Sequence, residues 1–199
     1  MPHAALDFGT KNRFPLGIAF DNIAAGAKRT GGHGIAMTAE KPLISVEWGD
    51  FHFRESVLRE ILDYWHKRRG ARPMPARSDI EVTELPSLLP YIFIIDVLEN
   101  PRDFRFRLAG THFREAVGEE VTGKRLAEVF PPEFGAEVRQ IWGSVVDDQR
   151  PVRGTGDLWV PGREYVKWEG VAMPLSTDGR TVNMLLGGVV FHQLARKKP

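Results

Sequence analysis

The last third of the sequence contains three β-rich runs separated by two short turn sequences. The runs cover residues 152–160, 164–175 and 181–192. Pro161-Gly162-Arg163 separates the first two runs and Thr177-Asp178-Gly179-Arg180 the last two, and both sequences are typical of β-hairpin connections. We therefore predict a three-stranded antiparallel meander, which restricts the chain to folds that contain an antiparallel sheet.

Two more strands are predicted in the middle of the sequence. Residues 91–98 are almost wholly apolar, which indicates a strand buried on both faces. In residues 104–108, Phe and Leu alternate with Arg, which is the pattern of a half-buried strand. Asn100-Pro101 marks a turn between the two runs. We expect them to pair ahead of the meander.

The register of this pair can be predicted from the loop. If residues 99–102 form the loop, Asp96 faces Arg105 and Ile94 faces Arg107. An Asp–Arg pair across the strands would fix the register, because a slip by one residue turns every side chain to the other face. A functional buried acid is the alternative role of Asp96, and the sequence leaves that alternative open.

The sequence also predicts two long helices. In residues 54–69 the apolar side chains recur at the spacing of one helix face, and Gly70 ends the helix. That face consists of Val57, Leu58, Ile61, Leu62 and Trp65. Pro131-Pro132 opens the second long helix, which continues to Val146. Shorter helical segments precede it.

The order of these elements predicts an α+β domain with one five-stranded antiparallel sheet. The helices inserted between the second and third strands can cover only one face. The other face needs the apolar stripe of helix 54–69, supplied by the same chain or by a second subunit. The chain divides into a poorly autonomous N-terminal arm (1–53), the helix and its connector (54–90), a core domain (91–192) and a basic tail (193–199). Within the arm, residues 42–48 could form a strand or a docking strap.

The composition argues against several chemistries. Cysteine is absent, which excludes disulfides, Cys-ligated metals, thiol nucleophiles and cysteinyl photoadducts. Lys and Arg total 27 against 26 Asp and Glu, a balance that argues against a nucleic-acid binder. The six histidines lack metal-binding spacing, so we expect no metal site. We see no membrane span and no secretory signal, and we expect a cytoplasmic protein.

Two patterns suggest enzymatic sites, and each has a simpler explanation. Residues 118–125 nearly match a phosphate-binding loop, but Arg125 replaces the hydroxyl residue that would hold magnesium. Helix-ending and turn glycines explain this pattern. The best catalytic candidates are His112 with Asp96 or Glu115, which would need to converge in one cleft. Otherwise His112 is a structural or solvated histidine.

Aromatic residues on predicted inward faces suggest a cavity. Their default role is to fill the core. Alternatively, they line a space between the sheet and the long helix, able to hold a small apolar or aromatic ligand. Two consecutive glycines in the last strand would leave room for it. The pocket candidates are Phe106, Leu108, His112, Phe113, Trp142, Trp168 and Gly187.

Several short stretches of the sequence are distinctive in combination, among them Leu88-Leu89-Pro90, residues 104–111 (FRFRLAGT) and Val121-Thr122-Gly123-Lys124. Through these stretches the chain resembles a bacterial family of stand-alone PAS-like proteins, and the similarity extends over about residues 55–191. The resemblance implies a PAS fold with strand order 2-1-5-4-3. It also implies a sensory or protein-interaction module without an established enzymatic activity. The sequence shows no kinase, cyclase or DNA-binding segment, so we expect any output to act on a partner in trans.

The resemblance further implies a homodimer formed through the helix ahead of the first strand. The dimer-interface candidates are Leu58, Ile61, Leu62 and Trp65. Arg77 and Asp79 lie in another matching stretch. We predict a structural ion pair between them, with ligand contact as the alternative. The long helix has no histidine to hold haem, and we assign no cofactor beyond an unidentified small apolar or aromatic ligand.

Three functions therefore stay open at the level of the sequence. The first is a ligand-responsive or partner-binding module without catalysis. The second is a small enzyme with a site near His112 and Asp96, and the third is a purely structural interaction subunit with a filled core. A ligand-sized cavity at Trp142 and Trp168 would favour the first.

Overall fold

The three C-terminal runs form the predicted antiparallel meander. In the computed structural model they are β4 (Val152–Leu158), β5 (Val166–Leu175) and β6 (Met184–Phe191), paired β4–β5 and β5–β6. Asp178 holds the second turn, because its carboxylate accepts hydrogen bonds from the Arg180 and Thr181 amides at 2.8 and 2.7 Å. These bonds lower the pKa of Asp178.

The structure describes residues 42–100, 102–158 and 166–192, all within the unit Glu40–Pro199. The first predicted hairpin turn, most of the N-terminal arm and the basic tail lie outside the described residues. The other elements are β1 (Ile44–Glu47), α1 (Ser56–Arg69), β2 (Ile92–Leu98), β3 (Asp103–Ala109), α2 (Thr111–Val117), α3 (Leu126–Val129) and α4 (Pro132–Asp148). Three short 3₁₀ helices, Arg77–Asp79, Val82–Glu84 and Leu89–Tyr91, connect α1 to β2.

The sheet has six strands in the order β1-β4-β5-β6-β2-β3, with every neighbouring pair antiparallel. The five predicted strands lie in the predicted order. The predicted strand count was wrong by one, because β1 pairs with β4 and adds an edge strand. This strand lies inside residues 42–48, the segment that could form a strand or a strap, so the sheet begins ahead of the domain boundary drawn at residue 53.

The predicted register of β2 and β3 is confirmed at one end and wrong at the other. Asp96 faces Arg105, as expected, but Ile94 faces Leu108 instead of Arg107. A β-bulge between Ile94 and Ile95 accounts for the shift, with Arg107 as the extra residue. The bulge lets two guanidinium groups reach one carboxylate. The Arg105 Nη2 and Arg107 Nε atoms lie 3.0 and 2.6 Å from the Asp96 oxygens.

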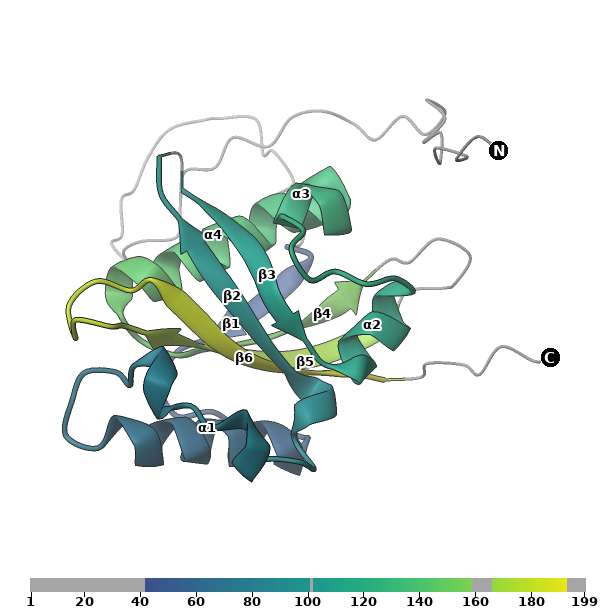
Figure 1. Cartoon of the computed structure of the whole chain (residues 1–199). Coiled ribbons are helices and arrows are strands. Elements are labelled where there is room, and N and C mark those ends of the chain that lie inside the picture. The colour runs from purple at the N-terminus through teal and green to yellow at the C-terminus, as the bar shows by residue number, and fades with distance from the viewer. Residues whose placement is uncertain (1–41, 101, 159–165, 193–199) are drawn as a thin grey trace, which may run out of the picture. The chain divides into compact units, whose positions relative to one another are not determined.

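Helices cover both faces of the sheet, with α2, α3 and α4 on one face and α1 on the other (Figure 1). Leu58, Ile61 and Trp65 are fully buried, and the Trp65 indole N–H donates to the Pro174 carbonyl at 2.9 Å. Gly188 makes room for Ile61 on this face of the sheet, since a Cβ at Gly188 would lie 2.6 Å from the Ile61 Cδ1 atom. Of the two alternatives, α1 of the same chain covers this face. These three side chains are therefore unavailable as a dimer interface, which corrects that assignment, and Leu62 is only half-buried.

The connector after α1 does not contain the predicted Arg77–Asp79 pair. Asp79 pairs with Arg72 at 2.8 Å and accepts a hydrogen bond from the Ala76 amide at 2.8 Å. The Ala76 bond is the main reason that the pKa of Asp79 is lowered. Arg77 instead donates to the Ile80 carbonyl at 2.8 Å. Both residues stabilise the same 3₁₀ turn, each through a different partner.

Candidate ligand pocket

The pocket lies between the sheet and α4, and Gly154 and Gly170 form part of its floor. Side chains alternate along β4 and β5, which places Gly154, Gly156, Trp168 and Gly170 on the face toward α4. Cβ atoms at Gly154 and Gly156 would lie 3.1 and 3.2 Å from atoms of the Trp168 indole, and one at Gly170 would lie 3.5 Å away. The missing side chains therefore let this large ring lie close against the strands.

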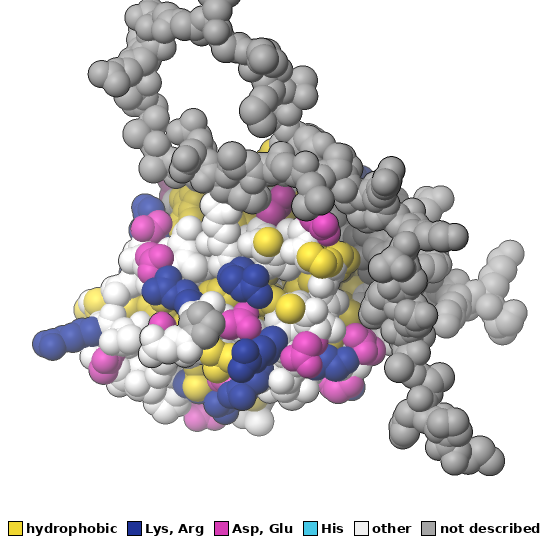
Figure 2. All heavy atoms as spheres, turned by 90° about the horizontal axis from the view of Figure 1, so that it is seen from above, with side chains coloured by type: hydrophobic (Ala, Val, Ile, Leu, Met, Phe, Trp, Pro, Cys, Tyr) yellow, Lys and Arg dark blue, Asp and Glu magenta, His cyan; other side chains and the backbone are white. Residues whose placement is uncertain are grey.

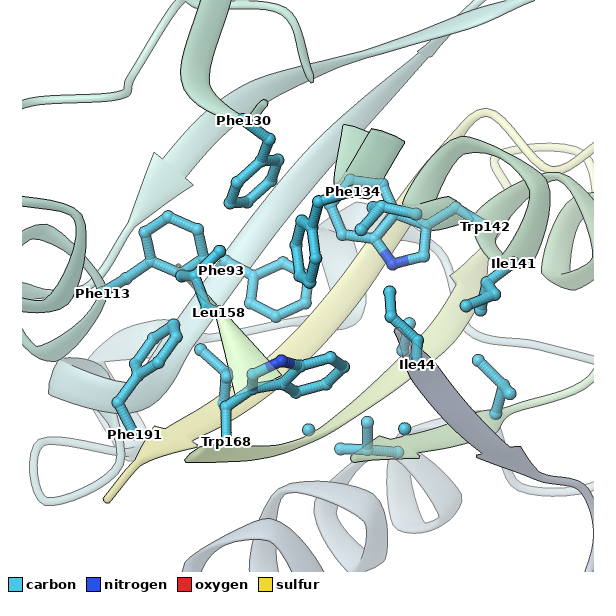
Figure 3. A pocket seen from close by; sticks show the side chains of 17 residues that line it. Ile44, Phe93, Phe113, Phe130, Phe134, Ile141, Trp142, Leu158, Trp168 and Phe191 are labelled. Carbon is cyan, nitrogen blue, oxygen red and sulfur yellow. The ribbon is translucent and has the colours of Figure 1, made fainter. Parts of the chain in front are cut away.

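Aromatic side chains from both layers form the walls (Figure 3). Phe93 of β2 stacks on Trp142 of α4 with 5.6 Å between ring centroids, and Phe134 meets Trp168 edge-on at 6.2 Å. The cavity has a volume of about 80 Å³ and is partly open to the surface. Its lining residues are Ile44, Phe93, Phe113, Phe130, Phe134, Val138, Ile141, Trp142, Val152, Gly154, Leu158, Trp168, Gly170, Val171, Ala172, Val189 and Phe191.

The edge strand β1 contributes to the pocket through Ile44. The Glu137 carboxylate on α4 accepts hydrogen bonds from the Leu43 and Ile44 amides at 3.1 and 2.9 Å. At the other end of β1, Glu47 pairs with Arg153 of β4 at 2.8 Å. Charged groups thus anchor β1 to both layers, while its apolar side chain faces the cavity.

Three of the seven predicted pocket residues line the cavity: Phe113, Trp142 and Trp168. Phe106 is fully buried behind it, 5.1 Å from the Phe113 ring centroid. The space left by Gly187 is filled, because a Cβ there would lie 2.0 Å from the Phe93 ring. The remaining candidates, Leu108 and His112, are also absent from the lining.

The sequence reasoning missed most of the aromatic wall. Phe93 lies in a run predicted to be buried on both faces, and nothing in an apolar run shows which side chains share a face with α4. Phe130 and Phe134 flank the start of α4, and Phe191 ends β6. One signal could have been used: side chains alternate between the two faces of a strand, so counting from Trp168 shows which residues of β5 share its face.

Of the predicted catalytic candidates, Glu115 acts electrostatically on His112, whereas Asp96 is held elsewhere. The Phe191 amide donates to His112 Nε2 at 2.9 Å, and burial lowers the pKa of this histidine. The oxygens of Asp96 are held by two arginines, near the opposite end of β2 from the junction with α2. The Ile92 carbonyl accepts a hydrogen bond from the Gly110 amide just before α2, and Asp96 lies four positions farther along β2, which is about 13 Å. Asp96 is therefore a structural partner, and His112 accepts a backbone hydrogen bond.

The segment that nearly matches a phosphate-binding loop forms backbone hydrogen bonds with the edge strand β3. The Gly123 amide donates to the Phe106 carbonyl at 2.7 Å, and the Phe106 amide donates to the Lys124 carbonyl at 2.9 Å. Gly118 ends α2 with a left-handed φ of 93°, and Gly123 has a φ of 87°. The glycines thus have the turn and helix-ending roles that the simpler explanation assigned to them.

The chemistry of the pocket is apolar. Within the described ranges, no charged side chain lines it, and its lining holds no serine or histidine that could act as a nucleophile or base. Trp168 is a special case, because its Nε1 atom is shielded from solvent and has no hydrogen-bond partner. The arrangement can bind and orient a small molecule, but it offers no proton-transfer group among these residues.

The outer surface carries charges of both signs (Figure 2). Arg102 pairs with Asp147 at 2.6 Å, and Arg139 pairs with Asp103 at 3.3 Å. On the face in view, positive and negative side chains are interspersed. In the part of the chain that the structure describes, no cluster of His, Asp or Glu could hold a metal ion, and no helix is long and apolar enough to span a bilayer.

Comparisons with known proteins place these features in a family. No curated protein matches the sequence. Similar solved structures include the PAS domain of Bordetella pertussis BvgS (17% identity, 55% of this chain and 85% of that chain, TM-score 0.43) and a Rhodobacter sphaeroides LOV protein (13%, 54% and 62%, 0.43). An RNA-binding light-oxygen-voltage receptor is 18% identical over 60% of this chain, with a TM-score of 0.41, and the chain spans only 36% of its length.

The family model described as "PAS domain" matches residues 53–190. This span is more than half of the chain and runs from just before α1 through nearly all of β6. The family region therefore holds both helical layers and the five predicted strands, whereas β1 lies outside it. The chain belongs to the PAS domain family.

Proposed function

We propose that this protein is a non-catalytic regulatory module that binds a small, mostly apolar molecule in the pocket between its sheet and α4. The observation that carries the proposal is the aromatic-lined cavity of about 80 Å³ between the sheet and α4. Well-packed interiors contain few voids larger than a water molecule. A cavity lined by aromatic and aliphatic side chains favours an apolar occupant, because water would find few polar partners there.

The size of the cavity limits the ligand. Pockets for drug-sized ligands usually measure about 300–1,000 Å³, and an engineered apolar cavity of about 150 Å³ takes up benzene. A cavity of about 80 Å³ therefore suits a small compound, unless the aromatic walls move apart. We do not propose flavin-adduct photochemistry, since the sequence has no cysteine.

The response would pass to a protein partner in trans. A ligand changes such a module only when it binds two conformations with different affinities, so the pocket and the partner surface must share a conformational equilibrium. Homodimer formation remains a prediction from the family resemblance, and we assign it no residues. Sedimentation of the purified protein tests it directly.

Native mass spectrometry combined with thermal unfolding tests the binding proposal. The wild-type protein should carry a small bound molecule, or gain thermal stability with small apolar compounds. Ile141 lines the pocket and is only half-buried, so Ile141→Trp can fill the cavity with little disturbance of the core, while Ile141→Val leaves it open. Binding should disappear in the first variant and persist in the second.

Absence of any bound mass and of any thermal shift in the wild-type protein would contradict the proposal. That result would favour the purely structural subunit, whose core needs no ligand. Binding that survives Ile141→Trp would place the ligand elsewhere on the protein and would equally contradict the assigned pocket.

A further inference from the structure

The indole N–H of Trp168 is a buried donor without an acceptor. The Nε1 atom is shielded from solvent, and no described group accepts a hydrogen bond from it. By contrast, the buried Trp65 indole donates to the Pro174 carbonyl at 2.9 Å. Buried polar groups in native proteins are nearly always paired, so an unpaired donor in a pocket points to a missing acceptor.

The ring cannot turn easily to find another partner. It packs against Gly154, Gly156 and Gly170, and a Cβ atom on any of these glycines would lie only 3.1–3.5 Å from the ring. Phe134 meets it edge-on from the α4 side. Figure 3 shows the Trp168 nitrogen on the ring edge that faces the other aromatic side chains. The fold therefore presents this N–H to whatever occupies the cavity.

A backbone carbonyl near the pocket edge offers no substitute in the present arrangement. A Cβ placed on Gly156 would lie 2.6 Å from the Leu43 carbonyl oxygen and 3.2 Å from Trp168 Nε1, so both groups flank the same point. They nevertheless form no hydrogen bond. A water molecule bridging these two groups is the rival explanation, and the experiment below separates it from a ligand.

We infer that the ligand is a compact, uncharged molecule with one hydrogen-bond acceptor, which accepts from Trp168 Nε1 while the rest of the molecule is apolar. This inference rests on the proposed function and specifies its ligand class. The acceptor is required because Trp Nε1 can only donate. The neutral charge follows from the described lining, which has no charged side chain to pair with an ionised group. Small ketones, ethers and aza-aromatic rings belong to this class.

Two probes of matched size test the inference on the full chain. Cyclopentanone carries one acceptor, and methylcyclopentane has the same number of heavy atoms and none. Headspace partitioning gives the Kd of each volatile probe for the wild-type protein, Trp168→Phe and Trp142→Phe. Trp142→Phe is the matched control, because it removes the other indole of the pocket.

The ratio of the two Kd values isolates the hydrogen bond. A change in cavity size acts on both probes, so the ratio cancels most of it. The preference for the ketone should fall about fivefold in Trp168→Phe, as expected for one net hydrogen bond, and should stay unchanged in Trp142→Phe. Cyclopentanecarboxylate should bind at least about tenfold more weakly than the ketone, because its charge loses water without gaining a partner.

Nuclear magnetic resonance of the wild-type indole N–H groups gives a second readout that needs no variant. Cyclopentanone should shift the Trp168 N–H resonance, and methylcyclopentane should shift it much less. An unchanged Kd ratio in Trp168→Phe, or a nuclear Overhauser effect from that N–H to bound water that persists with the ketone present, would overturn the inference and leave the proposed function intact. Failure of the wild-type protein to take up either probe would count against both.

Discussion

Replacing Glu169 by Gln tests whether the buried ion pair behind the pocket stabilises the fold. Glu169 is 1% exposed and lies on β5, next to Trp168 but on the opposite face of the sheet. It accepts hydrogen bonds from Arg153 Nε and Nη2 at 2.8 and 2.5 Å, and from the Arg54 and Glu55 amides at 3.1–3.2 Å. One carboxylate therefore connects β4, β5 and the segment that leads into α1.

The expected loss is about 3 kcal/mol. Removing one partner of a buried ion pair costs about 3–5 kcal/mol, because the other charge stays buried without compensation. Two features place Glu169→Gln at the lower end of that range. Arg153 keeps Glu47 at 2.8 Å, and the glutamine oxygen can still accept from the two amides. In a unit of this size the change should lower Tm by about 6–12 °C.

Urea unfolding at pH 7, followed by tryptophan fluorescence, measures the free energy of unfolding of each variant. The control is Glu119→Gln, whose Lys124 pair at 2.6 Å has side chains 50% and 33% exposed, and whose loss should cost less than about 1 kcal/mol. The double variant Arg153→Met/Glu169→Gln should lose less than the sum of the single changes. A cost for Glu169→Gln as small as that of the control would refute the reasoning.

Three further perturbations test other parts of the fold. Trp65→Ala should cost about 3–5 kcal/mol by opening a cavity under α1 and leaving the Pro174 carbonyl unpaired, whereas a change in sedimentation without loss of stability would contradict packing within the chain. Burial lowers the pKa of His112 below 6.5, so the unfolded chain takes up the proton first and stability should fall as the pH decreases through about 6.5. Urea titrations at pH 7.5 and 5.5 measure how much the free energy of unfolding changes between the two pH values. This change should be smaller in His112→Asn than in the wild-type protein, with His66 accounting for part of what remains. An equal change in both proteins would exclude His112 as its cause. Glu137→Gln should speed hydrogen exchange at the Leu43 and Ile44 amides by about fivefold while leaving global unfolding nearly unchanged. Unaltered exchange would show that these bonds do not hold the start of β1.

The parts of the fold that could be predicted are those fixed by local chemistry. Thr177-Asp178-Gly179-Arg180 forms a turn because one carboxylate satisfies neighbouring backbone amides, and this needs no distant residue. The α1 stripe is equally local, since its period shows which side chains share a face. The surface that this stripe covers cannot be predicted locally. It includes Gly188 of β6, more than a hundred residues away along the chain, which leaves room for the α1 side chains.

The register error and the missed strand have the same origin. Counting from the loop placed Arg107 opposite Ile94, but the extra residue at the bulge is stabilised by Asp96, which already pairs with Arg105. The edge strand β1 is four residues long and depends on carboxylates and guanidinium groups far along the chain. A pattern within one segment cannot reveal such partners. The pocket combines both problems, because its aromatic wall is assembled from strands and helices whose faces are set only by the finished sheet.

Two neighbouring residues of β6, Gly187 and Gly188, contact the pocket layer and α1 on opposite faces of the sheet. Gly187 makes room for the Phe93 ring on the pocket side, and Gly188 makes room for Ile61 on the α1 side, with hypothetical Cβ contacts of 2.0 and 2.6 Å. The Phe93 and Ile61 side chains thus occupy the space that a Cβ would take, so each packs directly against the backbone of β6. A ligand that displaces the Phe93 ring therefore moves other pocket side chains or β6 itself. A shift of β6 would change the surface on which α1 packs. Packed elements of this kind respond by moving between discrete arrangements, so under the proposed function a ligand-induced shift at the pocket would reach α1.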